Sequence, residues 1–224
     1  LGESFMFAND NLYAKWLDDI AESQKPDGQI PDVAPAYWNY YSDNMTWPGT
    51  YLMVADMLYR QFDNKQPIIR HYASMKKWMD YMRSKYMKGY LITKDKYGDW
   101  CVPPESPELI HAKDPARLTD GQLIATAYYY HFLGLMKKFA VLAGKPADGT
   151  VYDSMALKVA AAFNSRYLDS AACRYSNNTV TANLLPLYFG ITPVKYRHKV
   201  FENITDKIIN EGKGHISTGV IGTQ

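Results

Sequence analysis

Two segments of the sequence concentrate acidic and aromatic side chains. The first, residues 25–46, carries Asp27, Asp32, Tyr37, Trp38, Tyr40, Tyr41 and Asp43. The second, residues 88–117, carries Asp95, Asp99, Trp100, Glu105, Glu108, His111 and Asp114. Aromatic rings pack on the apolar C–H face of a sugar, and carboxylates accept hydrogen bonds from its hydroxyls. Loops this long in a compact domain usually build a site. Together the two segments predict a carbohydrate-binding cleft.

Single residues in and beside these segments have both functional and structural interpretations. Gly98 lets the backbone turn sharply beside Asp99 and Trp100, which favours a functional carboxylate, although Gly-Asp is also common turn chemistry. Trp38 and Trp47 either line the cleft or pack at the base of a loop. We therefore expect Asp99 to be the stronger candidate.

Histidines and helical acids outside the two segments are mostly expected to be structural. His71, His131 and His198 are isolated inside helical patterns, which is typical of packing residues. Asp18, in the first helical pattern, is expected on a solvated face. His215 differs, because it precedes a Thr-Gly pair in a terminal loop, and it is a candidate for a contact with ligand.

Composition excludes several classes of protein. The 224 residues hold 25 Lys and Arg against 23 Asp and Glu, a net charge of +2 without charge blocks, which argues against nucleic-acid and membrane-surface partners. No run approaches the about 18 apolar residues of a membrane span. Motifs for phosphate cradling, dinucleotide binding, zinc proteolysis and the esterase nucleophile are missing, and Cys101 and Cys173 have no metal-type spacing. We expect neither a metal nor a cofactor.

Apolar periodicity predicts seven helices and an all-α fold. The first begins at Asp10 and stops at Lys25-Pro26, and the others are expected over residues 47–62, 68–87, 118–143, 148–167, 181–189 and 194–210. Thr46 is expected to cap the second helix, with Pro48 in its first turn. A short hairpin is expected over residues 89–93.

The links between these helices alternate between long and short. Short links make helical hairpins, so every long loop falls on the same end of the fold. Helices that follow a long loop are apolar nearly all round and the others are amphipathic, as when one ring of helices encloses another. The pattern predicts an α/α toroid of the (α/α)6-barrel type, with residues 1–224 as a single, incomplete domain. An open helical array is the alternative.

Several motifs then follow one another along the chain. They are Lys15–Ile20, Gln24–Pro31, Asp32–Pro35, Ser42-Asp43 ahead of Trp47-Pro48, Tyr97–Trp100, Asn183–Leu187 and His215–Thr223. Their order and approximate spacing resemble the catalytic toroid of the bacterial α-L-rhamnosidases of glycoside hydrolase family 78. The resemblance covers nearly all of the chain.

The resemblance implies an (α/α)6 barrel that removes terminal α-L-rhamnose with inversion, through a general acid and a general base and without a metal. It also implies that the motifs of the acid and the base lie outside residues 1–224, leaving this segment with sugar contacts. The positions carried over are Tyr41, Asp43, Trp47, Asp99, Trp100 and His215. At Tyr41-Ser42-Asp43 the family often has Trp-Gly-Asp.

The expected partner is a rhamnose-containing oligosaccharide or glycoside, and two other functions stay open. One is a different α/α-toroid carbohydrate enzyme, either another hydrolase or a lyase; a lyase acting on polyanionic uronates would crowd basic residues into the long loops, and residues 26–46 have none. The other is a non-catalytic helical scaffold. The compartment also stays open.

Overall fold

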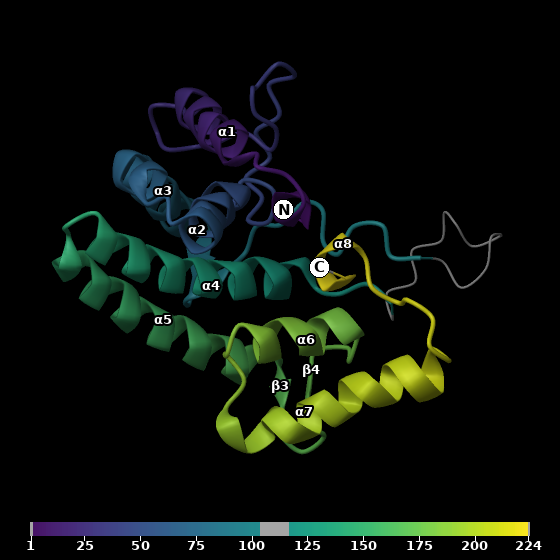
Figure 1. Cartoon of the computed structure of the whole chain (residues 1–224). Helices are drawn as coiled ribbons and strands as arrows, with labels where there is room; N and C mark the ends of the chain where they lie inside the picture. Colours follow the sequence, from purple (N-terminus) through teal and green to yellow (C-terminus); the bar gives the residue numbers. More distant parts are fainter. Residues whose placement is uncertain (1, 104–116, 224) are drawn as a thin grey trace. The chain divides into compact units, whose positions relative to one another are not determined.

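Helices dominate the computed structural model, which describes residues 2–103 and 117–223 (Figure 1). The described α-helices are α1 (Asp10–Glu22), α2 (Thr50–Phe62), α3 (Gln66–Tyr86), α4 (Gly121–Leu142), α5 (Pro146–Tyr167), α6 (Val180–Tyr188), α7 (Val194–Asp206) and α8 (Val220–Thr223). A 3₁₀ turn (Gly2–Phe5) precedes α1, and a π-helical turn (Lys207–Glu211) continues α7. The prediction of an all-α fold is confirmed.

Four two-residue strands interrupt the helices. β1 (Met87–Lys88) and β2 (Leu91–Ile92) flank a turn at Gly89 and Tyr90, both with positive φ, where the sequence predicts a hairpin. β3 (Leu168–Asp169) and β4 (Arg174–Tyr175) form a second, antiparallel hairpin in which Leu168 faces Tyr175. The sequence analysis missed this one, because two-residue strands are too short to show alternation.

The start of α2 differs from the prediction. The helix begins at Thr50, after turns over residues 45–49, and its N-cap is Gly49. The predicted cap at Thr46 is wrong, because the accepting side chain belongs to buried Asn44. The Asn44 Oδ1 atom accepts hydrogen bonds from the backbone N–H groups of Thr46 at 2.8 Å and Trp47 at 3.1 Å. The amide side chain thus holds the turns that lead into the helix.

The chain divides into two compact units, and the division falls within α4 and α5. The first unit is Leu1–Lys88 with His131–Leu157, and the second is Gly89–Tyr130 with Lys158–Gln224. The expectation of a single domain over residues 1–224 stays a prediction.

In the first unit, burial follows the predicted contrast between helices. Helix α2, which follows a long loop, buries seven of the eight residues from Tyr51 to Leu58, with Met53 half-buried. Helix α3, which follows a short link, buries one stripe that includes Trp78. The Trp78 ring lies 5.9 Å from the ring of Phe132 in α4, and α1 packs against both α2 and α3. The apolar pattern therefore reports burial correctly here.

A charged contact joins α1 to α3 and corrects the expectation of a solvated Asp18. Its carboxylate accepts hydrogen bonds from Arg70 at 3.0 Å and from the ring of buried His71 at 2.8 Å, and Asp18 is half-buried. Burial lowers the pKa of His71 below its usual 6.5, and the neighbouring Asp18 opposes that shift. The expectation that His71 is a packing residue is confirmed.

The second unit is built around an aromatic cluster beside α6. The Phe163 ring lies 5.0 Å from Tyr167 and 5.7 Å from Tyr175. Asn183 of α6 accepts the backbone N–H of Tyr175 at 2.8 Å, which ties α6 to β4. The Thr179 hydroxyl accepts the N–H of Ala182 at 3.1 Å and so caps α6, one residue before its start at Val180. These contacts fix the position of α6, which also contacts α7 and α8.

Replacing Gly49 is expected to destabilise the protein. A Cβ atom there would lie 2.4 Å from the carbonyl oxygen of Met45 and 2.2 Å from the Phe132 ring, so backbone would have to shift. We expect Gly49→Ala to lower the free energy of unfolding by about 1–3 kcal/mol, measured by thermal denaturation. Gly134→Ala in α4 is the matched control: its Cβ meets nothing within 4 Å, and a gain of about 0.5–1 kcal/mol is expected. Equal stability of the two variants would contradict the packing described here.

The stability of the protein is expected to fall as the medium is acidified below about pH 6.5. The unfolded chain protonates His71 near its ordinary pKa of about 6.5, whereas the folded protein takes up that proton only at lower pH. The stabilisation is therefore complete above pH 6.5 and is lost as pH falls toward the folded pKa. We expect His71→Gln to flatten the dependence by up to about 1.4 kcal/mol per pH unit in denaturant titrations. An unaltered slope in His71→Gln would count against this account.

Candidate functional site

The predicted site residues belong to both units. Tyr41, Asp43 and Trp47 lie in the first unit, on the segment between α1 and α2. Asp99, Trp100 and His215 lie in the second unit. Glu105, Glu108, His111 and Asp114 lie outside the described residues. The geometry of each group is given separately, and contact of any of these residues with a sugar stays a prediction.

In the first unit, three side chains converge on the half-buried carboxylate of Asp43. The Oδ1 atom accepts hydrogen bonds from the Gln29 amide at 2.7 Å and from the Tyr81 hydroxyl at 3.0 Å, and Oδ2 accepts one from the Tyr86 hydroxyl. Two ionised oxygens provide about four acceptor positions. Among residues 2–103 and 117–223, no further donor fills the second position on Oδ2, which is therefore open to a ligand hydroxyl.

The phenols beside Asp43 are held in their protonated form. Burial, with the nearby Asp43 carboxylate adding to it, raises the pKa of Tyr81 and of Tyr86 well above the usual value of about 10. The Lys85 ammonium also donates to the Tyr81 hydroxyl at 3.1 Å. The sequence analysis missed Gln29, Tyr81 and Tyr86 as partners of Asp43, although Gln29 lies in a motif that it singled out.

Tyr41 and Trp47 flank Asp43 and are both half-buried. The Tyr41 hydroxyl donates to the carbonyl oxygen of Ser23 at 2.7 Å, and the ammonium of Lys25 lies 3.8 Å from the centre of its ring. The polar atom of Tyr41 is thus engaged with the end of α1, and one face of its ring with a cation. Tyr41 therefore fixes the loop, whatever else it contacts.

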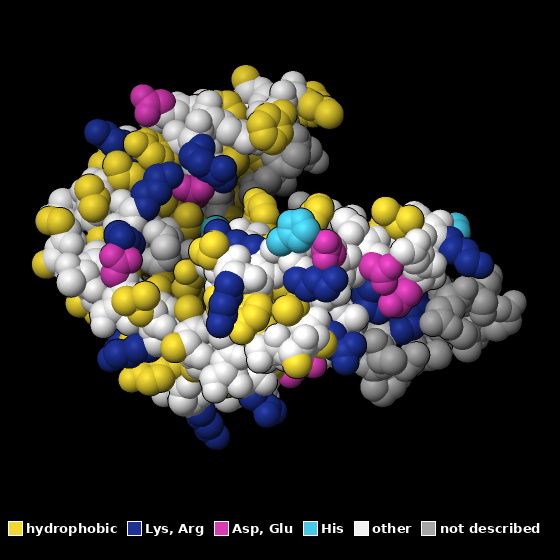
Figure 2. Space-filling model, turned by 90° about the horizontal axis from the view of Figure 1, so that it is seen from below, with side chains coloured by type: hydrophobic (Ala, Val, Ile, Leu, Met, Phe, Trp, Pro, Cys, Tyr) yellow, Lys and Arg dark blue, Asp and Glu magenta, His cyan; other side chains and the backbone are white. Residues whose placement is uncertain are grey.

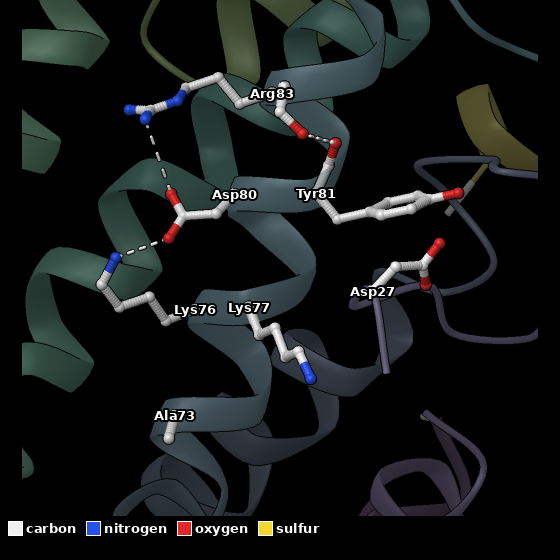
Figure 3. A pocket seen from close by; sticks show the side chains of 8 residues that line it. Asp27, Ala73, Lys76, Lys77, Asp80, Tyr81 and Arg83 are labelled. Carbon is white, nitrogen blue, oxygen red and sulfur yellow. Dashed lines mark hydrogen bonds and ion pairs between the residues drawn. The ribbon is translucent and has the colours of Figure 1, made fainter. Parts of the chain in front are cut away.

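A shallow pocket adjoins Tyr81 on the surface of α3 (Figure 3). It has a volume of about 450 Å³ and is lined by Asp27, Ala73, Lys76, Lys77, Asp80, Tyr81, Arg83 and Ser84. Figure 3 shows Lys76 and Arg83 reaching toward Asp80, at 2.6 and 4.0 Å, while Tyr81 extends toward the loop of Asp27. With a single aromatic ring and mostly paired charges, this pocket lacks the stacked faces of a sugar site.

In the second unit, the buried carboxylate of Asp99 organises the C-terminal segment. Its Oδ1 atom accepts the backbone N–H groups of Ile221 at 2.9 Å and Gly222 at 3.2 Å. Its Oδ2 atom accepts the N–H of Gly219 at 2.9 Å and the hydroxyl of Thr181 in α6. Gly219 directly precedes α8, and Ile221 and Gly222 lie in its first turn, where backbone donors have no partner within the helix. All four acceptor positions of Asp99 are therefore filled.

The glycines of the C-terminal motif are required by this contact. A Cβ atom at Gly219 would lie 2.2 Å from the carbonyl oxygen of Trp100, and one at Gly222 would lie 2.1 Å from the Thr181 hydroxyl. The Val220 N–H donates to the Trp100 carbonyl at 2.7 Å. The two motifs, Gly-Asp-Trp and Thr-Gly-x-x-Gly-Thr, thus pack against one another with backbone on backbone.

The side chain of Trp100 is more accessible than that of Asp99. Trp100 is 53% exposed, whereas Asp99 is 7% exposed. The Tyr97 ring lies 6.5 Å from the indole. Burial, with the Asp99 charge adding to it, raises the pKa of the neighbouring Tyr128 to about 12. His215 is exposed, in the segment that leads to α8. Asp99 therefore fixes backbone from the inside, and Trp100 faces outward.

The described residues give no sign of a metal centre or a membrane segment. No group of three or more His, Cys, Asp or Glu within residues 2–103 and 117–223 is arranged to hold a metal ion. In the same part of the chain, no helix has the length and apolar character needed to cross a bilayer. On the face seen in Figure 2, basic side chains are scattered, and several of them lie beside acidic ones.

The described helical hairpins, with acidic and indole side chains on their connecting segments, fit the class of six-hairpin glycosidase domains, which have an α/α toroid fold. The family model for the bacterial alpha-L-rhamnosidase six-hairpin glycosidase domain matches residues 1–224, and the chain belongs to this family. The predicted resemblance is confirmed.

Individual relatives agree with this assignment. The chain is 29% identical over 210 residues to an alpha-L-rhamnosidase of Streptomyces avermitilis, covering 93% of this chain and 19% of that protein. It is 26% identical over 224 residues to an alpha-L-rhamnosidase of Formosa agariphila, covering 99% and 23%. The chain thus spans about a fifth to a quarter of the length of these relatives.

Solved structures support the fold. The chain matches the structure of an alpha-L-rhamnosidase from Dictyoglumus thermophilum with a TM-score of 0.86 and 32% identity, over 97% of this chain and 24% of that one. It matches the Streptomyces avermitilis alpha-L-rhamnosidase complexed with L-rhamnose with a TM-score of 0.84 and 27% identity, over 96% and 19%. The predicted α/α toroid fold class is confirmed.

Asp99→Asn is expected to loosen the start of α8. The amide side chain keeps the shape of Asp99 but turns an N–H₂ group toward backbone donors, which leaves at least one of them without an acceptor. We expect a loss of about 1–3 kcal/mol in local stability, and faster hydrogen–deuterium exchange at residues 219, 221 and 222. Asp153→Asn removes only an exposed ion pair with Lys137 and should change little, about 0.5 kcal/mol or less. Equal exchange in the two variants would show that Asp99 does not hold this segment.

Proposed function

We propose that the intact protein hydrolyses terminal α-L-rhamnosides with inversion, and that residues 1–224 supply sugar contacts rather than the reacting carboxyl groups. The observation that carries this proposal is the arrangement at Asp99 and Trp100. A buried, fully bonded carboxylate fixes the backbone beneath an exposed indole. An aromatic face on a rigid support suits a sugar with an apolar side, and rhamnose has one at its C6 methyl group.

The two carboxylates of the candidate site have different roles in this proposal. Asp43 keeps one acceptor position and accepts a hydrogen bond from a sugar hydroxyl. Asp99 has no acceptor position left, so it acts as a positioning residue for Trp100 and α8. Neither is proposed as the general acid or base. Inversion needs two such carboxyl groups about 6.5–9.5 Å apart, with a water molecule between the base and the sugar.

The mechanism assigned to this segment is orientation of the sugar. In the second unit, Trp100 stacks on a sugar ring, and in the first unit Asp43 accepts a hydrogen bond from a sugar hydroxyl. Each contact orients a sugar toward the reacting carboxyl groups. Orientation of this kind converts an encounter into a nearly unimolecular reaction, which is a large part of the rate enhancement by enzymes. Tyr41, Trp47 and His215 remain proposed sugar contacts, on the strength of the family motifs in which they lie.

The intact protein is expected to release p-nitrophenol from p-nitrophenyl α-L-rhamnopyranoside, with β-rhamnose as the first product by NMR. Trp100→Ala should weaken L-rhamnose binding by at least about tenfold in calorimetry, because a lost aromatic contact is worth about 1.5–3 kcal/mol.

Trp100→Phe is the matched control and should keep most of the affinity, since it retains a ring. An intact protein that is folded but inactive on the aryl rhamnoside would refute the proposed function. An unchanged affinity in Trp100→Ala would instead remove that residue alone from the site.

A further inference from the structure

Two lysines of the first unit contact the side chains that donate to Asp43. The ammonium of Lys25 donates to the Oε1 atom of Gln29 at 2.9 Å, and that of Lys85 donates to the hydroxyl of Tyr81 at 3.1 Å. Gln29 and Tyr81 in turn donate to the same atom, Oδ1 of Asp43, at 2.7 and 3.0 Å. Each route from a lysine to the carboxylate therefore consists of two hydrogen bonds in series. Neither lysine has a role in the sugar contacts proposed above.

Each lysine fixes the direction of the next hydrogen bond in its route. The side-chain amide of Gln29 has one accepting atom and one donating atom, whereas an ammonium can only donate. Because Lys25 occupies Oε1, the Nε2 atom of Gln29 faces Asp43. A tyrosine hydroxyl has a single proton, so a hydroxyl that accepts from Lys85 keeps that proton for Asp43. A charged donor also polarises and strengthens the next hydrogen bond in such a chain.

Lys85 is held one turn after Tyr81 in α3. Its ammonium lies 4.3 Å from the centre of the Tyr81 ring and 3.4 Å from the carboxylate of Asp27, in the loop toward which Tyr81 extends (Figure 3). That carboxylate also accepts the backbone N–H of Gln29 at 3.1 Å. The Gln29 N–H, together with the Lys85 ammonium, lowers the pKa of Asp27 below its usual value, although desolvation opposes them. Asp27 therefore stays ionised and joins the two routes to one another.

The loop that carries Lys25 is attached to α3. The Gln24 amide nitrogen donates to the carbonyl oxygens of Gly28 and Ser74, both at 3.0 Å, and the Ser74 hydroxyl donates to the Gln24 Oε1 atom at 2.8 Å. Gly28 has a φ of +106°, and a Cβ atom there would lie 2.7 Å from the carbonyl oxygen of Lys77. Loop and helix are thus in contact through their backbones, which fixes the positions of the two lysines relative to one another.

We propose that Lys25 and Lys85 are positioning residues for sugar binding, which direct two donors to Oδ1 of Asp43 and so reserve Oδ2 for a hydroxyl of the ligand. This inference rests on the proposed function and adds to it the orientation of the accepting carboxylate. Rotation of that carboxylate would break both directed hydrogen bonds, so the ligand meets a fixed acceptor. Without its lysine, the Gln29 amide can flip or the Tyr81 hydroxyl can turn toward water, and the acceptor is no longer fixed.

The test measures the affinity of the intact protein for L-rhamnose by calorimetry. Lys85→Met removes the ammonium and keeps the length of the side chain, and it is expected to weaken binding at least about threefold, the effect of one hydrogen bond. Its kcat for p-nitrophenyl α-L-rhamnopyranoside should change less than about twofold, because the contact holds substrate and transition state alike. Lys85→Arg still donates and should bind within about twofold of the unaltered protein. Lys25→Met and Lys25→Arg should give the same pair of results.

A double-mutant cycle separates positioning from a general effect of charge. Because Lys85 acts through the hydroxyl of Tyr81, Lys85→Met should weaken binding no further when it is made in Tyr81→Phe, which lacks that hydroxyl. Lys77→Met is the matched control. It removes the same charge from an exposed position of the same helix, and it should bind L-rhamnose as the unaltered protein does.

Three results would overturn the inference: an unchanged affinity in either Lys85→Met or Lys25→Met, an equal loss in Lys77→Met, or additive losses in the cycle. A weaker affinity with a lower unfolding temperature, neither of them restored in Lys85→Arg, would assign Lys85 to stability and would also overturn it. If the unaltered protein is folded and does not hydrolyse the aryl rhamnoside, the proposed function itself fails. An active protein whose lysine variants bind normally removes this inference alone.

Discussion

The buried carboxylate of Asp99 is the contact on which the arrangement of the second unit depends. It joins segments that are far apart in the sequence, because its partners lie 82 residues away in α6 and 120 to 122 residues away at the start of α8. A carboxylate in the interior is costly unless donors surround it, and here three backbone amides and a hydroxyl do so. The same contact requires glycine at positions 219 and 222 and leaves the indole of Trp100 at the surface. One acid thus explains two motifs that look unrelated in the sequence.

Asp43 is supported in a different way. Its three donors are side chains, from the loop and from the end of α3, and one acceptor position stays available. A carboxylate held by protein groups and still able to accept is suited to a ligand hydroxyl, while a saturated one is suited to holding backbone. The number of hydrogen-bond donors to each carboxylate therefore distinguishes Asp43 from Asp99, which the sequence motifs alone do not distinguish. It also explains why Tyr81 and Tyr86, which carry no motif, matter as much to the candidate site as Tyr41.

The helices could be predicted from the sequence because their signal is local. The spacing of apolar residues gave the seven long helices, and the contrast between α2 and α3 in burial followed from it. Helix caps and short strands were harder to predict from the sequence. The side chain that accepts hydrogen bonds ahead of α2 belongs to Asn44 and not to the predicted Thr46, and the strands β3 and β4 are too short to show an alternating pattern. The partners of Asp43 and Asp99 lie 38 to 123 residues away in several cases, and no local pattern reports such a pairing. Family motifs pointed to the acids without explaining them.

The phenols beneath Asp43 have a consequence for alkaline conditions. Because burial and the adjacent carboxylate keep Tyr81 and Tyr86 protonated far beyond neutrality, both continue to donate in media that would ionise an ordinary tyrosine. The hydrogen bonds from these two phenols to Asp43 are therefore expected to persist over the pH range in which most enzymes operate. A decline in turnover on the alkaline limb of a rate profile is therefore not expected to originate in these two phenols.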